Sequence, residues 1–254
     1  MPDTEVVKEQ HLLCSWSFSG DKPLLSTGKY AYQLTEGNCA VQLSHDPALT
    51  GTAAFIKEGT YYYIPRADCP GLNIKGKNAQ VTILAWVKRW QKSHVQCEAI
   101  AGMWNETEKK RQYCLFLNLR LFDSADQVCG HISGVGGPTP GQKWCIDASI
   151  GKTPVNYSEW TFVGFTYDGA SISSYLNGSL DSREKHNPYL YTEGIFDGGA
   201  NGSDFTVGAV HRLEEMGNYF VGHIALLSVY DKALTEDEIN HVMGESRAQI
   251  FQSK

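Results

Sequence analysis

The stretch YFVGHIALLSVYDKALTEDEINHVMG, residues Tyr219–Gly244, decides the fold prediction because a strand signal passes directly into a helix signal. An apolar run rich in β-branched residues extends from Val221 to Tyr230, and it is too short to span a membrane. Thr235 can then cap a helix, because Glu238 stands three residues later and completes a capping box. The stretch therefore predicts the closing strand of a sheet and a short helix, Thr235–Met243, over its end.

The same stretch resembles the closing segment of laminin-G-like jelly rolls in the concanavalin A-like lectin/glucanase superfamily. Earlier segments match in the expected order: VTILAWVKRW (81–90), WTFVGFTYDG (160–169) with SYLNGSL (174–180), and DFTVGAV (204–210). The resemblance implies an all-β fold, a two-sheet antiparallel jelly-roll sandwich with a short C-terminal helix. We expect a single domain over 12–246, with 1–11 and 247–254 as terminal extensions. Function stays open, because this fold hosts lectins, adhesion modules, glycosidases and polysaccharide lyases.

Composition excludes two classes of partner. The chain of 254 residues carries a net charge of −6 and has no basic run, which argues against nucleic-acid binding. No segment is apolar over the roughly 18 residues that a membrane span needs. The N-terminal stretch MPDTEVVKEQHLLCSW lacks an apolar signal core, whereas the resembled family is often extracellular, so the compartment is left open. Nothing in the sequence indicates the oligomeric state.

The seven cysteines are an odd count, so at least one thiol must be unpaired. None of them forms the C-x-x-C spacing of a zinc or redox site. Without a visible secretion signal, we expect mostly reduced thiols. In a secreted protein, Cys129 and Cys145 would be the first pair to test, because they flank one loop.

Two adjacent strands carry the polar residues of interest. In QYCLFLNLRL (112–121) one face is apolar, and the other carries Gln112, Cys114, Phe116, Asn118 and Arg120. In QVCGHIS (127–133) the polar face carries Gln127, Cys129, His131 and Ser133. A four-residue turn, Asp123–Asp126, would set Asn118 opposite His131 and Arg120 opposite Cys129.

These side chains should gather on one outer sheet face. In the resembled superfamily, glycans lie on the concave face of a sheet. We therefore predict non-catalytic glycan binding, with the ligand-binding candidates Trp104, Asn118, Arg120, Gln127, His131 and Tyr175. Trp144, in a long Gly/Pro-rich loop over 134–154, could add a stacking ring. The alternative is the ordinary solvated face of an antiparallel sheet.

Two other functions remain as alternatives. A polysaccharide lyase acting on a uronate-containing glycan would use His131 and Tyr175 to move the proton and Arg120 to neutralise the carboxylate. A glycoside hydrolase is disfavoured, because the E-x-D-x-E strand motif of the superfamily glucanases does not occur. The third possibility is a protein-interaction or adhesion module, which would require an exposed apolar patch.

The sequence gives no firm indication of a cofactor or a metal. Asp197, Asn201 and Asp204 in a Gly-rich loop offer oxygen ligands suited to calcium, but such clusters are usually turns. Members of the resembled family often hold a structural calcium with acidic residues in the closing strand. Here Ile224 and Ala225 stand at those positions, which makes that site doubtful.

Overall fold

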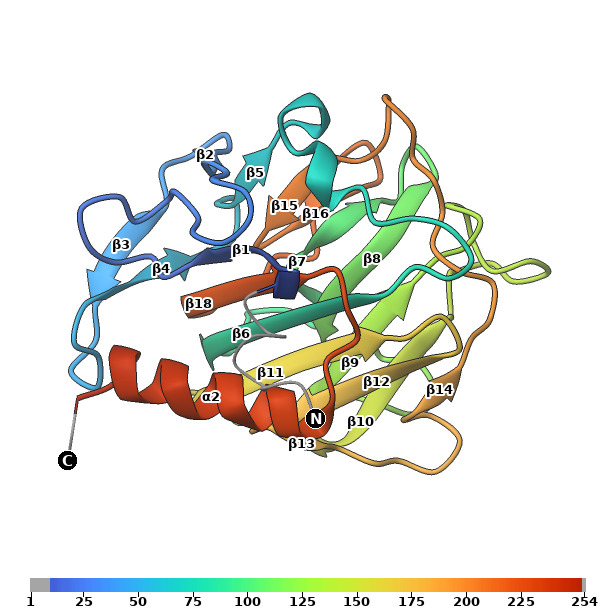
Figure 1. Ribbon diagram of the computed structural model, residues 1–254. Helices are drawn as coiled ribbons and strands as arrows, with labels where there is room; N and C mark the ends of the chain where they lie inside the picture. Colours follow the sequence, from blue (N-terminus) through green and yellow to red (C-terminus); the bar gives the residue numbers. More distant parts are fainter. Residues whose placement is uncertain (1–9, 253–254) are drawn as a thin grey trace.

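The computed structural model describes residues 10–252 as two antiparallel sheets packed face to face (Figure 1). Residues 1–9 and 253–254, parts of the expected terminal extensions, lie outside the described residues. The first sheet has the order β13-β12-β11-β6-β18-β4-β3, with β1 beside β18 and β14 beside β12. The second has the order β10-β9-β8-β7-β15-β5-β2, with the β16–β17 pair beside β7. The predicted all-β sandwich is confirmed.

The elements have the following bounds. In the first sheet they are β1 (Leu12–Trp16), β3 (Gln42–His45), β4 (Thr52–Ile56), β6 (Val81–Arg89), β11 (Trp160–Tyr167), β12 (Ser171–Leu176), β13 (Ser179–Leu180), β14 (Tyr189–Leu190) and β18 (Gly222–Tyr230). In the second they are β2 (Thr35–Glu36), β5 (Tyr62–Ile64), β7 (Glu98–Asn105), β8 (Lys110–Leu117), β9 (Gln127–Ile132), β10 (Ala148–Pro154), β15 (Phe205–Val207), β16 (Val210–Arg212) and β17 (Glu215–Gly217). The 3-10 turns η1 (Arg66–Asp68) and η2 (Pro70–Leu72) and the helix α2 (Glu236–Ile250) complete the described elements.

Strand β6 lies at the centre of the first sheet, between β11 and β18. Its alternate residues Val81, Ile83 and Ala85 enter the core between the two sheets. Leu84 and Trp86 point the other way, into an apolar cluster that α2 covers. The apolar character of both faces of this strand thus follows from its being covered on two sides.

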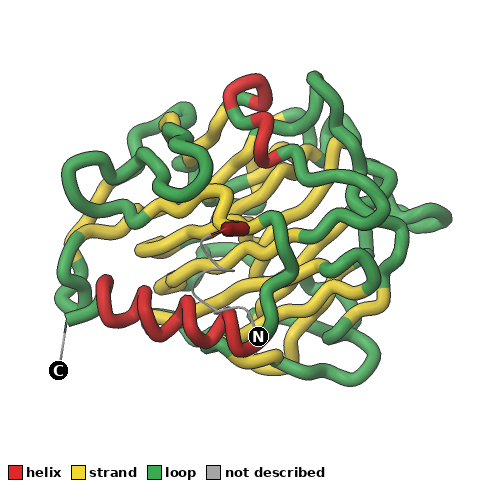
Figure 2. Tube along the Cα trace, viewed as in Figure 1, coloured by secondary structure: helices red, strands yellow, loops and turns green. Residues whose placement is uncertain are grey.

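Helix α2 begins as predicted but ends later. The Thr235 hydroxyl accepts from the Glu238 N–H (3.3 Å), and the Glu238 carboxylate accepts from the Thr235 N–H (2.8 Å), which forms the capping box. The helix does not stop at Met243. It continues to Ile250 because Ser246 accepts a hydrogen bond from the Trp86 indole (2.9 Å), which holds the last turns against the first sheet (Figure 2). No helix within residues 10–252 is long and apolar enough to cross a membrane.

A fully buried ion pair joins the two sheets. Arg89 ends β6 in the first sheet, and Glu98 begins β7 in the second. The guanidinium donates to both carboxylate oxygens of Glu98, at 3.0 and 2.7 Å, and to Asp126 at 2.6 Å. It also donates to the Val155 carbonyl (3.2 Å), while the ring of Tyr157 stacks 4.4 Å away. This arrangement satisfies the charge of an arginine side chain that has 0% exposure.

All seven cysteines, each within the described chain, are free thiols, Cys129 and Cys145 included. Cys39 alone is exposed, and Cys97 is half-buried. Burial raises the pKa of Cys97 and of Cys145 to about 11, and that of Cys129 to about 12. Thiols with such pKa values are almost wholly protonated at neutral pH, so they behave here as small apolar side chains.

Candidate functional site

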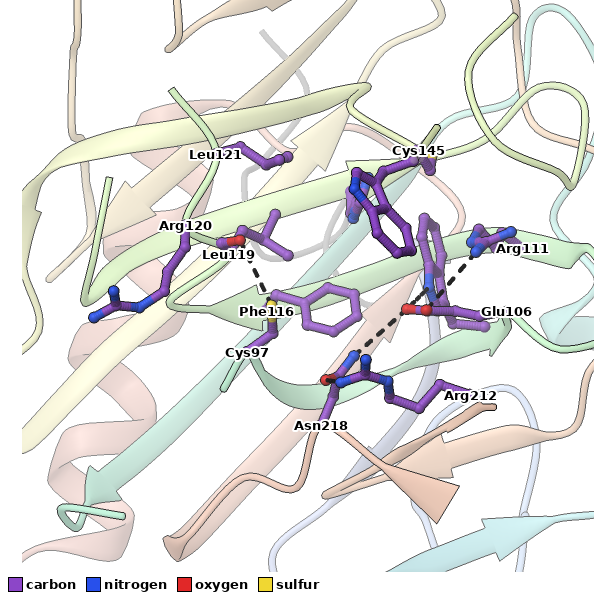
Figure 3. Close-up of a pocket in the computed structure, with 13 residues that line it drawn as sticks. Cys97, Glu106, Arg111, Phe116, Leu119, Arg120, Leu121, Cys145, Arg212 and Asn218 are labelled. Atoms are coloured by element: carbon purple, nitrogen blue, oxygen red, sulfur yellow. Dashed lines mark hydrogen bonds and ion pairs between the residues drawn. The ribbon is translucent and has the colours of Figure 1, made fainter. Parts of the chain in front are cut away.

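A cavity of about 360 Å³ opens on the outer face of the second sheet, and we refer to it as the first cavity. It lies over β7, β8 and β9, on the side of this sheet away from the core (Figure 3). Its wall is formed by Cys97, Trp104, Glu106, Arg111, Phe116, Leu119, Arg120, Leu121, His131, Trp144, Cys145, Arg212 and Asn218. Aromatic and basic side chains therefore predominate around the opening.

His131 lies at the floor of this cavity, where strand β9 presents it next to Cys114 of β8. Its ring is 4.4 Å from the Trp104 ring and 5.8 Å from the Phe116 ring, and only 5% of the residue is exposed. Neither ring nitrogen makes a well-formed hydrogen bond within residues 10–252. Burial, with a contribution from the Arg111 charge, lowers the pKa of His131 to about 3, and the Cys145 backbone offsets a little of that decrease. The imidazole is thus neutral and offers one donor and one acceptor.

A β-bulge brings Trp104 and Arg111 together on this face. Trp104 is paired with Arg111 while Met103 is paired with Tyr113, so Gln112 is the extra residue of β8. The guanidinium of Arg111 lies 5.8 Å from the Trp104 ring centre and 3.7 Å from the Glu106 carboxylate. The indole N–H of Trp104 also donates to Glu106 (3.3 Å). Glu106 therefore holds both side chains in place.

The β16–β17 hairpin supplies the remaining basic group. The Arg212 guanidinium donates to the side-chain oxygen of Asn218 (2.8 Å), and the Asn218 amide donates to Glu106 (3.4 Å). The Nε of Arg212 is buried and has no hydrogen-bond partner within the described chain. A buried N–H without an acceptor is costly, so this N–H has hydrogen-bonding capacity that the described chain does not use.

Trp144 provides an exposed aromatic surface at the rim. It lies in the loop between β9 and β10, and 55% of it is exposed although it lines the cavity. The neighbouring Lys143 ammonium is 4.8 Å from its ring centre. A large exposed ring beside a cavity can pack on an apolar ligand face while its N–H remains free to donate.

Two of the sequence-predicted residues lie elsewhere, because the predicted register was wrong. His131 is opposite Cys114, not Asn118, and Cys129 is opposite Phe116, not Arg120. Strand β8 ends at Leu117, and Asn118 is a buried loop residue whose amide donates to the Gln96 carbonyl (3.1 Å). Gln127 accepts from the Ala125 N–H (2.7 Å) and is not part of the cavity wall.

Trp104, Arg120 and His131 do line the same cavity. Arg120, however, is an exposed loop residue, and Figure 3 shows its guanidinium directed away from Glu106 and Arg212. Its Nε donates to the side chain of Asn118 (3.2 Å). Arg120 is therefore a rim residue, and Arg111 and Arg212 are the basic groups of the interior.

Tyr175 was predicted to lie near this face, but it belongs to the other sheet. It is on β12, in the apolar cluster that α2 covers. The three residues considered for an elimination reaction, His131, Tyr175 and Arg120, are consequently not brought together. A His131 imidazole with a pKa of about 3 is also a poor proton acceptor.

The calcium candidates do not form a common site. Asp197 makes an ion pair with Lys75 (2.5 Å) and accepts from the Gly199 N–H (2.9 Å). Asp204 accepts from the Arg66 N–H (2.8 Å). Among the described residues there is no cluster of three or more His, Cys, Asp or Glu side chains that could hold a metal ion.

Sequence reasoning missed Glu106, Arg111 and Arg212. The sequence predicts a charged loop over Glu106–Arg111; Glu106 does lie in the turn after β7, but β8 already begins at Lys110, so Arg111 is a strand residue. One signal could have indicated Glu106 and Arg111: both are charged residues of a hairpin that also carries the aromatic residue Trp104. Arg212 carries no such signal, because β16 and β17 are only three residues long each.

Comparison with known proteins identifies the fold family. A family model described as the concanavalin A-like lectin/glucanases superfamily, Laminin_G_3, matches residues 58–240, which is well over half of the chain. No curated protein sequence matches the chain with statistical significance.

Solved structures share the architecture at low sequence identity. Domain 4 of AbnA, an extracellular GH43 arabinanase from Geobacillus stearothermophilus solved with arabinotriose, has a TM-score of 0.60 and 17% identity, over 92% of this chain and 98% of that one. The ligand-binding domain of botulinum neurotoxin serotype D, solved with N-acetylneuraminic acid, has a TM-score of 0.55 and 13% identity, over 96% of this chain and 53% of that one. The chain thus spans about half of the toxin fragment, and both likenesses concern the fold alone.

Proposed function

Because the chain belongs to the concanavalin A-like lectin/glucanase superfamily, we propose that it binds a glycan, without catalysis, in the first cavity of its second sheet. The observation that carries this proposal is the set of unsatisfied polar groups inside the cavity. Within residues 10–252, neither ring nitrogen of His131 nor the Nε of Arg212 makes a well-formed hydrogen bond, and both residues line the cavity together with the exposed Trp144. A sugar can make both kinds of contact: its hydroxyls can hydrogen-bond to these polar atoms, and its apolar ring face can pack on the Trp144 indole.

The charges around the cavity favour an acidic sugar. Arg111, Arg120 and Arg212 line it, and among the described residues of the wall Glu106 is the one carboxylate. Glu106 already has three partners in Trp104, Arg111 and Asn218. A carboxylate of a uronic or sialic acid would be an acceptor for the unsatisfied Nε–H of Arg212, and hydrogen bonds of this charge-assisted kind are the stronger ones.

A solved structure with this fold also supports the proposal. The arabinanase domain and the toxin domain were captured with arabinotriose and N-acetylneuraminic acid respectively. The arabinanase domain matches this chain over 98% of its own length, so a domain of this architecture can hold a sugar.

The test is a glycan array followed by calorimetric titration of the best acidic ligand and of its neutral counterpart, for instance sialyllactose against lactose. Trp144→Ala should weaken binding about tenfold, which corresponds to about 1.4 kcal/mol. Arg212→Met should weaken binding of the acidic ligand about ten- to a hundredfold, because a charge-assisted hydrogen bond contributes about 1.5–3 kcal/mol.

Two controls keep the result specific. Arg247→Met removes the same charge from an exposed position of α2, the helix that covers the first sheet. This variant should bind the acidic ligand as the unmodified protein does. Leu190→Ala removes an exposed apolar side chain that is not part of the cavity wall. The proposal fails if Trp144→Ala and Arg212→Met bind as the unmodified protein does. Ultraviolet-absorbing unsaturated uronate products would show catalysis and overturn the non-catalytic part.

A further inference from the structure

A second binding site is indicated by the hydroxyl of Thr206. Phe205 and Val207 enter the core between the sheets, so strand alternation turns Thr206 to the outer face of the second sheet. Only 1% of the residue is exposed, and its hydroxyl has no hydrogen-bond partner within residues 10–252. A buried hydroxyl without a partner destabilises the fold, so its retention calls for an explanation.

This hydroxyl lines a separate cavity of about 180 Å³, which we call the second cavity. Two phenol rings form one wall: those of Tyr61 and Tyr63, with ring centres 6.3 Å apart and planes tilted by 46°. The Tyr61 ring packs directly on the backbone of Gly37, and a Cβ atom at residue 37 would overlap this ring. The rings thus present an apolar surface next to a polar floor.

The remaining wall accepts hydrogen bonds and carries negative charge. Glu36 uses one carboxylate oxygen to accept from the Val41 N–H (2.9 Å), and Asp204 uses one to accept from the Arg66 N–H (2.8 Å). Each carboxylate has further acceptor capacity on its other oxygen. No lysine or arginine of the described chain lines the cavity, and His211 completes the polar wall. An anion is disfavoured here, whereas a neutral ligand rich in hydroxyl donors matches the carboxylates, the phenol rings and Thr206.

The two cavities share the β16–β17 hairpin but no residue. His211 lines the second cavity, and its neighbour Arg212 lines the first. These two adjacent residues of β16 line different cavities, so the hairpin separates the two sites. We propose that the second cavity is a distinct site for a neutral sugar residue, stacked on Tyr61 and Tyr63 and hydrogen-bonded to Thr206 and Asp204.

This proposal does not depend on the acidic-glycan proposal, because it rests on different residues. The probes are cellotriose, lactose and xylotriose, each added to the whole chain while the Thr206 methyl signal is followed by nuclear magnetic resonance. We expect at least one of them to shift this signal in a saturable way. Thr206→Val preserves shape and removes an unsatisfied hydroxyl, so thermal stability should be unchanged or slightly higher.

Affinity for the neutral probe in Thr206→Val, which lacks the threonine methyl and is therefore measured by calorimetric titration, should fall about three- to tenfold, as for the loss of one neutral hydrogen bond. Asp204→Asn keeps an oxygen for the Arg66 N–H and replaces the other with a donor, so it should weaken binding about ten- to a hundredfold. Arg212→Met should leave this binding unchanged. The proposal is overturned if no neutral probe shifts the Thr206 signal, if Thr206→Val and Asp204→Asn bind normally, or if Arg212→Met abolishes the binding. A shift produced by calcium chloride and by none of the sugars would also overturn it.

Discussion

Replacing Arg89 tests whether the Arg89–Glu98 ion pair between the sheets is as fully buried from solvent as its geometry indicates. In Arg89→Met the apolar part of the side chain is kept, and both hydrogen bonds to Glu98 are lost. The Glu98 carboxylate, with a side chain that is 2% exposed, would then be buried without its cation. Breaking a buried pair in this way costs about 3–5 kcal/mol, a large part of the roughly 5–15 kcal/mol that stabilises a typical protein.

The measurement is urea unfolding with a comparison of midpoints and slopes. Glu98→Gln should cost less, about 1.5–3 kcal/mol, because Arg89 would keep Asp126 and the Val155 carbonyl as partners. The double variant Arg89→Met/Glu98→Leu should recover much of the loss, since neither charge then has to be buried. Arg247→Met serves as the matched control. A loss below about 1 kcal/mol for Arg89→Met, as for a surface pair, would refute the reasoning.

Three further predictions follow from the cap, the thiols and the buried imidazole. Thr235→Ala should lower the free energy of unfolding by about 0.5–2 kcal/mol through loss of the helix cap, and an unchanged urea midpoint would contradict the observed capping box. Thiol titration without reductant should give seven thiols in the denatured chain and one that reacts fast, Cys39, in the native chain; five or fewer in the denatured chain would reveal a disulfide. In the folded chain the pKa of His131 is about 3, whereas in the unfolded chain the imidazole has its ordinary pKa of about 6.5. Between pH 6.5 and pH 3, unfolding therefore takes up a proton at this residue. The protein should therefore lose about 1.4 kcal/mol of stability per pH unit as the pH falls through this window, and His131→Leu should lack this contribution while the exposed His94→Leu retains it. Equal pH slopes for the two variants would show that the imidazole is not buried in its neutral form.

The fold could be predicted because local signals agreed with the global architecture. The closing strand, the capping box and the central strand β6 each have a pattern that is complete within a few residues. The outer-face orientation of His131 was predicted for the same reason, since alternation along β9 is uninterrupted. The helix end was not, because the last turns depend on the contact of Ser246 with Trp86, which is distant in sequence.

The site was predicted less well because it depends on irregular backbone. Asn118, Arg120, Phe122 and Asp123 all have positive φ, which is uncommon for residues other than glycine, and they turn the expected strand into a loop. The bulge at Gln112 reverses the alternation that would have turned Arg111 toward the core. Tyr175 was misplaced for another reason, because a local pattern does not reveal to which of two sheets a strand belongs.

The uneven exposure of the thiols makes this protein suited to single-position labelling without any substitution. Burial raises the pKa of Cys14, Cys69, Cys97, Cys114, Cys129 and Cys145, which suppresses their reactive thiolate forms. Cys39 is exposed, and its neighbour Asn38 lines the second cavity. An environment-sensitive fluorophore attached through a maleimide to Cys39 would thus sit at the edge of that cavity and report its occupancy as a change in emission.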